Sequence, residues 1–474
     1  MSQKTIHEPA RDVPVRSSVD VLVCGGGCAG ATAALAAARQ GAKVALVEQA
    51  GFCGGAHTSA GVNGVGGWQY DLDGRPLIDG IPLEIARAVA DAGGAKNEQV
   101  QRLSRPRPGG PDYRDGGLGC YWVAASPEVM KLVLDRMLTA AGVDVLLHAS
   151  AVMPIVDDGS VRGCFVESKS GRQAILADVT IDCTGDGDIA ARAGAACEIG
   201  RPGDNACQPM TKIFTVGQAD VGPLWYSTDK PDPEPDPLVR DRYRKAIELA
   251  RRRGEIVHNP NDLLCAATPI NPADPQTRMV NFTRIQNVSS VDVNDLTRAE
   301  MIGREQVREA VAFLRKYVRN SRDAYLIATA GLGIRESRRI VGEYVLNGGD
   351  VRNSRSFDDQ VVRGIYLLDI HNPTEVGKPS VLEMLDAPYG IPYRCLLPQG
   401  LDGLLLAGRC ISGDHVAHAS YRIQSHCMAM GQAAGTAAAM AVRRGIAARD
   451  LPADELRNQL AADGANVGPE ARTD

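Results

Sequence analysis

The sequence predicts an α/β fold, and three stretches of the chain carry this prediction. Residues 19–48 have the pattern of an apolar strand, a glycine-rich turn, an Ala-rich helix and a second apolar strand. Residues 143–182 read as a series of strands separated by Gly-containing turns. Residues 403–441 read as a short apolar strand and a long helix of small residues. We therefore predict a Rossmann-like dinucleotide-binding domain with an inserted β-meander, and a mixed α+β substrate or cap domain in the rest of the chain.

The first glycine-rich turn predicts a dinucleotide site. Gly25, Gly27 and Gly30 have the G-x-G-x-x-G spacing, which gives a tight turn, an approach for a pyrophosphate and close packing of helix on strand. The start of the helix offers free N–H groups and a positive dipole end to phosphates. Glu48 ends the second strand, where an acid accepts hydrogen bonds from an adenosine ribose. The alternative is a structural βαβ unit with an empty turn. Because strand, helix, second strand and acid are all present, we predict dinucleotide binding.

Two later stretches predict further contacts with the same ligand. The segment 51–67 contains seven glycines, and this density indicates backbone held close to a ligand. The strand that ends at Asp182 runs into the turn Thr184-Gly185-Asp186, which precedes an Ala-rich helix. We expect this turn to be a second place where the backbone meets the cofactor.

Length and charge bound the organisation of the chain. At 474 residues it is too long for one compact core, so we expect several domains. A net charge of −5 gives no reason to expect a nucleic-acid partner, whose proteins usually carry a basic face. The predicted boundaries are 15–200 for the first part of the dinucleotide-binding domain, 201–385 for the substrate or cap domain, 386–450 for the second part of the dinucleotide-binding domain and 451–474 for a tail.

The N-terminus and the cysteines predict a cytoplasmic protein. Residues 1–18 are polar and charged, without the apolar region of a secretory signal. The sequence has no uninterrupted run of about 18 apolar residues, so we expect no membrane span. The twelve cysteines are scattered without C-x-x-C pairs, which favours free, mostly buried thiols in a reducing compartment.

Three motifs in the second half carry a resemblance to a known family. They are G-I-R-E-S-R-R at 333–339, P-Y-R-C-L-L-P at 392–398 and A-G-R-C-I-S at 407–412. Together with the first 60 residues, the chain resembles the FAD-dependent oxidoreductases of the glutathione-reductase and fumarate-reductase type of flavin fold. The resemblance covers 126–200 and 326–443 as well, and it is poor over 60–120 and 215–320, the regions that shape a substrate pocket.

The resemblance implies FAD as the cofactor. In that family the T-G-D turn and the C-terminal G-R-x-I-S…D block are flavin features. The resemblance also puts the start of the final helix near the flavin, where a helix N-terminus stabilises the negative charge at N1/O2 of the reduced ring. Beyond the first βαβ unit, the predicted cofactor-binding residues are Gly54, Gly55, Thr58, Val152, Thr184, Gly185, Asp186, Gly408, Arg409, Asp414 and Arg422.

His57 has three interpretations. It lies in Ala-His-Thr-Ser-Ala-Gly, 27 positions after Gly30. Succinate dehydrogenase and fumarate reductase flavoproteins link FAD through a histidine in a similar context, which implies a covalent bond. A non-covalent flavin contact and a structural imidazole remain open, because the closer relatives more often have an apolar residue at this position.

Five further residues are candidates for catalysis. Arg335 and Arg338 either belong to an ion-pair network or bind an anionic substrate group bidentately. His415, or its neighbour His418, could accept a proton near the flavin, as could Tyr393. The spacing of these histidines is not that of a metal site, so we predict no metal.

The sequence thus predicts an FAD-dependent dehydrogenase that oxidises a small polar organic substrate at C–OH, C–N or C–C by hydride transfer to flavin N5. One alternative is a fumarate-reductase-like enzyme that reduces an activated C=C bond. Another, from a different class, is a flavoprotein that modifies or binds RNA. Because no second nucleotide motif is evident, the electron acceptor would be oxygen, a quinone or a redox protein. Substrate, acceptor and oligomeric state, including a homo-oligomer, stay open.

Overall fold

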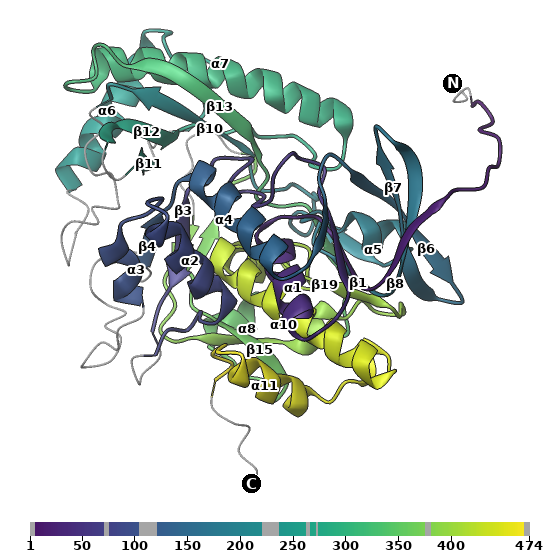
Figure 1. The fold of residues 1–474 in the computed structure, drawn as a ribbon. Helices are drawn as coiled ribbons and strands as arrows, with labels where there is room; N and C mark the ends of the chain where they lie inside the picture. Colours follow the sequence, from purple (N-terminus) through teal and green to yellow (C-terminus); the bar gives the residue numbers. More distant parts are fainter. Residues whose placement is uncertain are drawn as a thin grey trace.

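The structure is a computed structural model that describes residues 5–70, 75–103, 121–219, 237–261, 266–271, 274–374 and 381–468. Its core is a sheet of seven strands with helices against it (Figure 1). The strands are β5 (Asp144–Leu146), β2 (Val44–Val47), β1 (Val15–Cys24), β8 (Gly171–Asp182), β7 (Ser160–Ser168) and β6 (Ser150–Asp157) in that order, with β19 (Leu404–Leu406) also paired to β8.

Strand β8 joins two kinds of sheet. Its first half pairs antiparallel with β7, and β7 pairs antiparallel with β6, which makes the meander. Its second half, Thr180 to Asp182, pairs parallel with β19, and β1 lies parallel along its other edge. The parallel order β5-β2-β1-β8-β19 is that of a Rossmann-like unit. The predicted fold class, a dinucleotide-binding α/β domain with an inserted meander, is confirmed.

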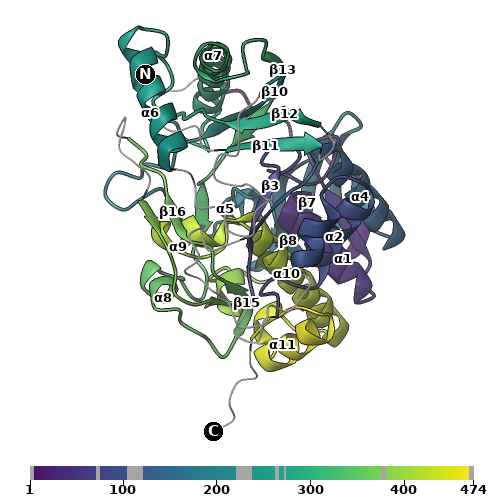
Figure 2. The same cartoon turned by 90° about the vertical axis from the view of Figure 1, so that its left-hand side faces the viewer.

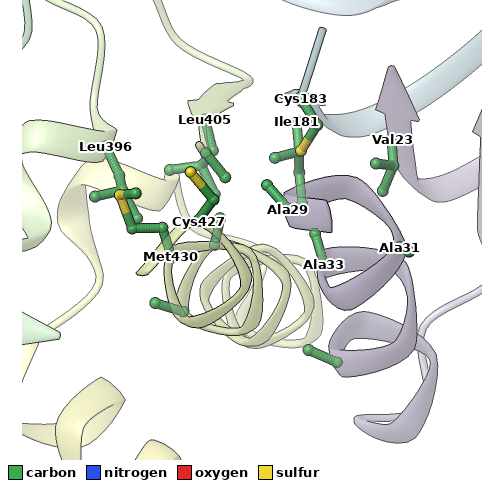
Figure 3. Packing of buried hydrophobic residues seen from close by; sticks show 14 of the residues in the cluster. Val23, Ala29, Ala31, Ala33, Ile181, Cys183, Leu396, Leu405, Cys427 and Met430 are labelled. Atoms are coloured by element: carbon green, nitrogen blue, oxygen red, sulfur yellow. The ribbon is translucent and has the colours of Figure 1, made fainter. Parts of the chain in front are cut away.

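Helices α1 (Cys28–Arg39) and α10 (Gln424–Arg444) pack together at unusually short range. A Cβ added at Gly431 would lie 2.1 Å from the carbonyl oxygen of Ala29, and one at Gly435 would lie 2.1 Å from that of Ala33. Figure 3 shows Ala29 and Ala33 directed towards α10 from α1. The small residues of both helices therefore allow backbone contact, which larger side chains would prevent.

A second, four-stranded sheet lies at one end of the molecule with two long helices (Figures 1 and 2). We call it the cap sheet. It consists of β11 (Ala266–Asn271), β12 (Asp274–Asn281), β10 (Thr211–Gly217) and β13 (Tyr325–Gly333), with α6 (Pro237–Arg252) and α7 (Val293–Tyr317) packed near it. The sequence between 238 and 320 indicates helices, and the structure adds the strands β11 and β12 there. Their prolines and asparagines mask a strand pattern, which the pairing of β12 with β10 and of β11 with β12 stabilises.

The remaining elements connect these two parts. The helices are α2 (Ile81–Asp91), α3 (Asn97–Leu103), α4 (Pro127–Ala140), α5 (Asp188–Arg192), α8 (Gly348–Arg352), α9 (His415–Tyr421) and α11 (Ala453–Ala462), with short 3-10 helices at Tyr393–Leu396 and Ala448–Asp450. The paired strands are β3 (Gly64–Trp68) with β4 (Tyr121–Ala124), β9 (Cys197–Ile199) with β14 (Arg338–Ile340), β15 (Gln360–Gly364) with β18 (Tyr389–Pro392), and β16 (Leu368–Ile370) with β17 (Val381–Glu383).

Some local features differ from the sequence expectation. Ser-Pro-Glu at 126–128 predicts a helix start with Ser126 as its cap. Ser126 is the N-cap of α4, but its hydroxyl makes no capping hydrogen bond among the described residues, so Pro127 and Glu128 carry the helix-start signal. The segment predicted as a tail contains α11, whose Arg457 donates to the carbonyl oxygen of Gln360 at 2.6 Å. The domain boundaries stay predictions. Within the described part of the chain, no helix is long and apolar enough to cross a membrane.

The contact between α1 and α10 generates a stability prediction. Replacing Gly435 with Ala adds helix propensity of up to about 1 kcal/mol. It also forces the two backbones apart, and overpacking of this kind costs about 1–3 kcal/mol or more. We expect Gly435→Ala to lower the free energy of unfolding, measured by urea denaturation. The matched control is Gly445→Asn at the left-handed C-cap of α10, where a new Cβ meets no described atom within 4 Å. Equal stability of wild type and Gly435→Ala would contradict the close contact.

Candidate functional site

The first glycine turn places three glycines in different surroundings. A Cβ at Gly25 would lie 2.5 Å from the carbonyl oxygen of Cys183, and one at Gly30 would lie 1.8 Å from that of Gly25. At Gly27 the nearest described atom is Gly55 Cα, at 3.8 Å. Gly27 is the N-cap of α1, and no described side chain caps this helix end. Gly25 and Gly30 thus serve packing, while Gly27 leaves room over an uncapped helix N-terminus.

Glu48 closes the second strand beside this turn. Its Oε2 accepts from the backbone N–H of Gly26 at 2.7 Å, and its Oε1 accepts from that of Ala50 at 2.7 Å. Burial raises the pKa of the Glu48 carboxyl, against the effect of these backbone donors. The backbone N–H of Ala149 donates to the Glu48 carbonyl oxygen at 3.0 Å, so the start of β6, with Val152, lies next to this residue.

The segment 53–61, which we call the glycine loop, packs on the first turn. The backbone N–H of Gly54 donates to the carbonyl oxygen of Gly26 at 2.8 Å, and the Gly54 carbonyl accepts from Cys28 Sγ at 3.2 Å. A Cβ at Gly55 would lie 2.7 Å from Gly27 Cα. Thr58 Oγ1 donates to the Cys53 carbonyl at 2.9 Å, so its hydroxyl holds the loop itself.

The T-G-D turn and the C-terminal arginine block meet in space. Asp186 Oδ1 accepts from Arg409 Nη2 at 2.9 Å, and a Cβ at Gly185 would lie 2.7 Å from the same nitrogen. Arg409 Nη1 is buried and has no hydrogen-bond partner among the described residues. Gly408, at φ +95°, lies against Ala29 at the start of α1. Two stretches that are far apart in the sequence thus converge next to the first turn.

The buried carboxylate of Asp182 organises the T-G-D turn, and the sequence analysis assigned it no role. It accepts from the backbone N–H and the hydroxyl of Thr184 at 3.0 and 2.7 Å. It also accepts from the backbone N–H groups of Ile189 and Ala190, both at 2.9 Å, at the start of α5. Its position at the end of an apolar strand was the signal that could have identified it.

The start of α9 is capped by Asp414, and the start of α10 contacts the start of α1. Asp414 caps α9 by accepting from the backbone N–H of Ala417 at 2.7 Å, and its other oxygen accepts from that of Gly348 at 3.0 Å. Gln424, at the start of α10, donates to the Val62 carbonyl at 2.7 Å and accepts from Cys28 Sγ at 3.6 Å. The N-termini of α1 and α10 are therefore neighbours.

Several imidazoles near these helix starts are fully buried. Neither ring nitrogen of His57 has a hydrogen-bond partner in the described part of the chain, and burial lowers its pKa to about 4. Both nitrogens of His418 also lack a described partner, and burial together with nearby guanidinium groups lowers its pKa well below the usual value. His415 Nδ1 instead lies 2.8 Å from Glu336 Oε1. His57 and His418 are thus neutral at pH 7.

The other predicted catalytic residues are distributed over different contacts. Arg338 pairs with Asp188 at 2.8 Å on the side of α5. The hydroxyl of Tyr393, which is buried, donates to the Ala448 carbonyl at 2.9 Å. Arg335 donates to the Pro209 carbonyl at 2.6 Å and to Thr211 Oγ1, at the start of the cap sheet. Of these three, only Arg335 lies in a larger group of polar and charged side chains.

That group is one the sequence analysis missed, and we call it the arginine cluster. Its members come from the ends of cap-sheet strands and from the loops beside β16 and α9. A short apolar run followed by Asp369-Ile370-His371 was the only local signal for it, because the other members are isolated in sequence. The cluster consists of Gln208, Thr211, Arg284, Arg335, Asp369, His371 and Arg422.

These features define a protein that binds an extended dinucleotide across two converging turns. Room over Gly27, an uncapped helix N-terminus and the unused donor of Arg409 all fit a pyrophosphate-bearing cofactor such as FAD. In the described ranges, no group of three or more His, Cys, Asp or Glu side chains could hold a metal ion.

The chain belongs to the FAD dependent oxidoreductase family, whose sequence profile matches residues 20–460. It is therefore an FAD-dependent oxidoreductase, and FAD is its cofactor. A digeranylgeranylglycerophospholipid reductase from Methanoculleus marisnigri is 29% identical over 181 residues, which cover 38% of this chain and 42% of that protein. The matched segment thus spans less than half of the relative's length.

Solved structures give more distant likenesses. A geranylgeranyl bacteriochlorophyll reductase-like protein from Thermoplasma acidophilum has 13% identity and a TM-score of 0.44, over 95% of this chain and 85% of that one. The p-nitrophenol 4-monooxygenase PnpA from Pseudomonas putida has 10% identity and a TM-score of 0.47, over 91% and 82%. The flavin-dependent brominase Bmp2 has 13% identity and a TM-score of 0.46, over 94% and 84%. These likenesses are too distant to indicate a substrate or a reaction.

The space over Gly27 generates a prediction about cofactor content. Gly27 has φ −65°, which any residue can adopt, so Gly27→Val should fold normally. Its side chain fills the space over the helix N-terminus, so we expect largely colourless protein with wild-type circular dichroism. Glu48→Arg should also lose flavin. Gly30→Ala, whose Cβ meets backbone, should instead lower the melting temperature. If Gly27→Val keeps a full complement of FAD, the pyrophosphate does not lie over this helix end.

Proposed function

We propose that the protein is an FAD-dependent dehydrogenase that oxidises a small polar organic substrate at C–OH, C–N or C–C. The bound flavin supplies the redox chemistry by accepting a hydride at N5. A hydrogen bond between the cap sheet and the glycine loop supports a substrate site next to the cofactor. The backbone N–H of Gly331 in β13 donates to the Ser59 carbonyl at 2.8 Å. Side chains at the end of β13, Arg335 first among them, therefore lie close to the cofactor-binding stretch.

For the cofactor, we propose that the uncapped start of α1 binds the pyrophosphate and that Arg409 donates its unused N–H to it. Glu48 has further lone pairs available for the adenosine ribose. The start of α10 would stabilise negative charge on the reduced ring. We propose that this arrangement is of the glutathione-reductase and fumarate-reductase type of flavin fold. The proposed contacts comprise Gly27, Glu48, Gly54, Gly55, Val152, Gly185, Gly408 and Arg409, while Gly25, Gly30, Thr58, Thr184, Asp186 and Asp414 hold the turns and loops in place. Arg422, which the sequence placed with the cofactor, is held by Asp369 and is proposed to face the substrate instead.

For the substrate, we propose Arg335 as a binding residue. The contacts of Arg338 with Asp188, of His415 with Glu336 and of Tyr393 with Ala448 support positioning roles instead. His57 is proposed to contact the flavin, because a buried imidazole without a described partner is costly unless a ligand meets it. Whether that contact is a covalent bond is a separate proposal with its own test.

A second candidate is a reductase of an activated C=C bond. It is favoured by the name of the archaeal relative, a reductase, although the shared segment covers only 42% of that protein. For the dehydrogenase we propose oxygen, a quinone or a redox protein as the electron acceptor. The reductase would instead take its electrons from an external donor such as a reduced redox protein.

The direction and substrate class can be tested by flavin bleaching. Under anaerobic conditions, hydroxy acids, sugars or amines should reduce the flavin of a dehydrogenase, whereas enoates should reoxidise the reduced flavin of a reductase.

Arg335→Lys should raise KM roughly 10- to 100-fold, since loss of a bidentate contact costs about 1.5–3 kcal/mol. Arg338→Lys is the matched control and should leave KM near wild type. Equal KM changes in both variants would count against a substrate contact at Arg335.

A covalent bond at His57 can be tested by denaturation. If the imidazole is bonded to the flavin, acid-denatured protein retains its yellow colour on a filter, and its mass exceeds that of the polypeptide by one FAD. His57→Ala should still bind FAD, because the adenosine side is untouched, but should release it when denatured. Passage of all flavin from wild-type protein through the filter would end the covalent proposal and leave a non-covalent contact.

A further inference from the structure

The side-chain amide of Gln208 presents unused donors inside the arginine cluster. Gln208 is 2% exposed, and its Oε1 accepts from the backbone N–H of His371 at 3.1 Å and from Arg422 Nη2 at 3.4 Å. Both partners can only donate, which fixes the orientation of the amide. Its Nε2 therefore points away from them, and it has no hydrogen-bond partner among the described residues.

Arg422 is held in the same way, with one donor unused. Its Nη2 donates to the Asp369 carbonyl oxygen at 2.9 Å and lies 3.3 Å from Asp369 Oδ2. Its Nε is buried and lacks a partner in the part of the chain that the structure describes. Buried N–H donors are normally paired, so two unpaired ones on adjacent side chains indicate a missing acceptor.

The surroundings of this pair are rich in positive charge and fixed in geometry. His371 Nε2 lies 3.2 Å from Asp369 Oδ2, and its Nδ1 lies 3.3 Å from Arg284 Nη2. The carboxylate accepts and the guanidinium donates, so His371 carries its proton on Nε2 and is neutral. Although burial alone would raise the pKa of Asp369, His371 and the guanidinium groups of Arg422 and Arg335 hold it well below its usual range.

Two further guanidinium groups converge on one hydroxyl. Arg284 Nη1 donates to Thr211 Oγ1 at 3.3 Å, and Arg335 Nη1 donates to the same oxygen. Two like charges held this close attract an anion.

The cluster also lies next to the cofactor-binding stretches. Arg422 is two positions before Gln424, which contacts Cys28 and Val62. On the other side, β13 is bonded to the glycine loop through Ser59 and leads to Arg335.

We propose that the substrate carries a carboxylate, that Gln208 Nε2 and Arg422 Nε bind its two oxygens, and that the Arg335 guanidinium binds the same carboxylate, with Arg284 adding positive charge. Asp369 and His371 act as positioning residues for the two donors. This inference rests on the proposed dehydrogenase function and names its substrate class. Each of the two unused donors can form a charge-assisted hydrogen bond with one oxygen of the carboxylate.

The test is calorimetric titration of the purified FAD-loaded protein with malonate, and with malonamide as the uncharged isostere. Malonate should bind and malonamide should not. Gln208→Glu keeps the oxygen that accepts from His371 and Arg422 but replaces the unused donor with an anionic acceptor. It should weaken malonate binding roughly tenfold or more. The matched control is Gln173→Glu on the meander strand β8, which makes the same charge change and should bind malonate like wild type.

A second variant keeps the test decisive if Gln208→Glu does not fold. Arg422→Lys retains the charge but removes the Nε donor, and it should weaken malonate binding at unchanged flavin content. Binding of malonate with equal affinity by wild type and these variants would overturn the inference. Loss of FAD rather than of malonate binding would also overturn it, because the donors would then face the cofactor. If the FAD-loaded protein oxidises only uncharged substrates, the carboxylate site is overturned but the proposed dehydrogenase is not. A flavin that no substrate reduces overturns the proposed dehydrogenase, whatever malonate does.

Discussion

The backbone contact between α1 and α10 is the constraint on which the rest of the site depends. Gly431 and Gly435 let α10 approach the first turns of α1 until carbonyl oxygens of Ala29 and Ala33 meet its backbone. That approach brings the N-terminus of α10, with Gln424, beside Cys28. A helix from the C-terminal part of the chain thereby completes a site that the N-terminal βαβ unit begins. Larger side chains at either glycine would separate the two halves of the cofactor site.

Polar groups in this protein divide into those that are satisfied and those that are not. Asp182 accepts four hydrogen bonds, and Glu336 accepts from Arg339 at 2.5 Å and from the backbone N–H of Gln208 at 3.0 Å. Such buried charges are tolerable because every oxygen is paired, and they fix the turns around them. Among the described residues, Arg244 Nε and several hydroxyls and imidazoles are also unpaired, but the unpaired guanidinium and amide donors beside the cofactor-binding turns or in the arginine cluster are those of Arg409, Arg422 and Gln208. The contrast supports placing ligands next to these side chains rather than next to the paired ones.

The sequence predicts the parts of this protein that depend on local constraints. The strand, glycine turn and acid of the first βαβ unit are local, because the turn itself requires Gly25 and Gly30. The pairing of Asp186 with Arg409 joins residues 223 positions apart, and only the resemblance to a family linked their two blocks. The arginine cluster could not be predicted, because pairing of cap-sheet strands brings Gln208 near Arg284, and His371 reaches them only by tertiary contact from the end of β16. Strands β11 and β12 were missed for a related reason, since tertiary pairing overrides a weak local pattern.

Because the chain is synthesised from its N-terminus, the α1–α10 contact also affects when the protein can fold. Cys28 and Gln424 are 396 positions apart, so α1 leaves the ribosome long before its partner exists. At translation rates of roughly 5–20 residues per second, its Ala-rich face waits about 20–80 seconds for α10. During that interval the nascent chain exposes apolar surface and holds only half of a nucleotide site. We therefore expect the two halves of the cofactor site to come together only when synthesis of the chain is nearly finished, and until then the N-terminal unit is exposed to aggregation.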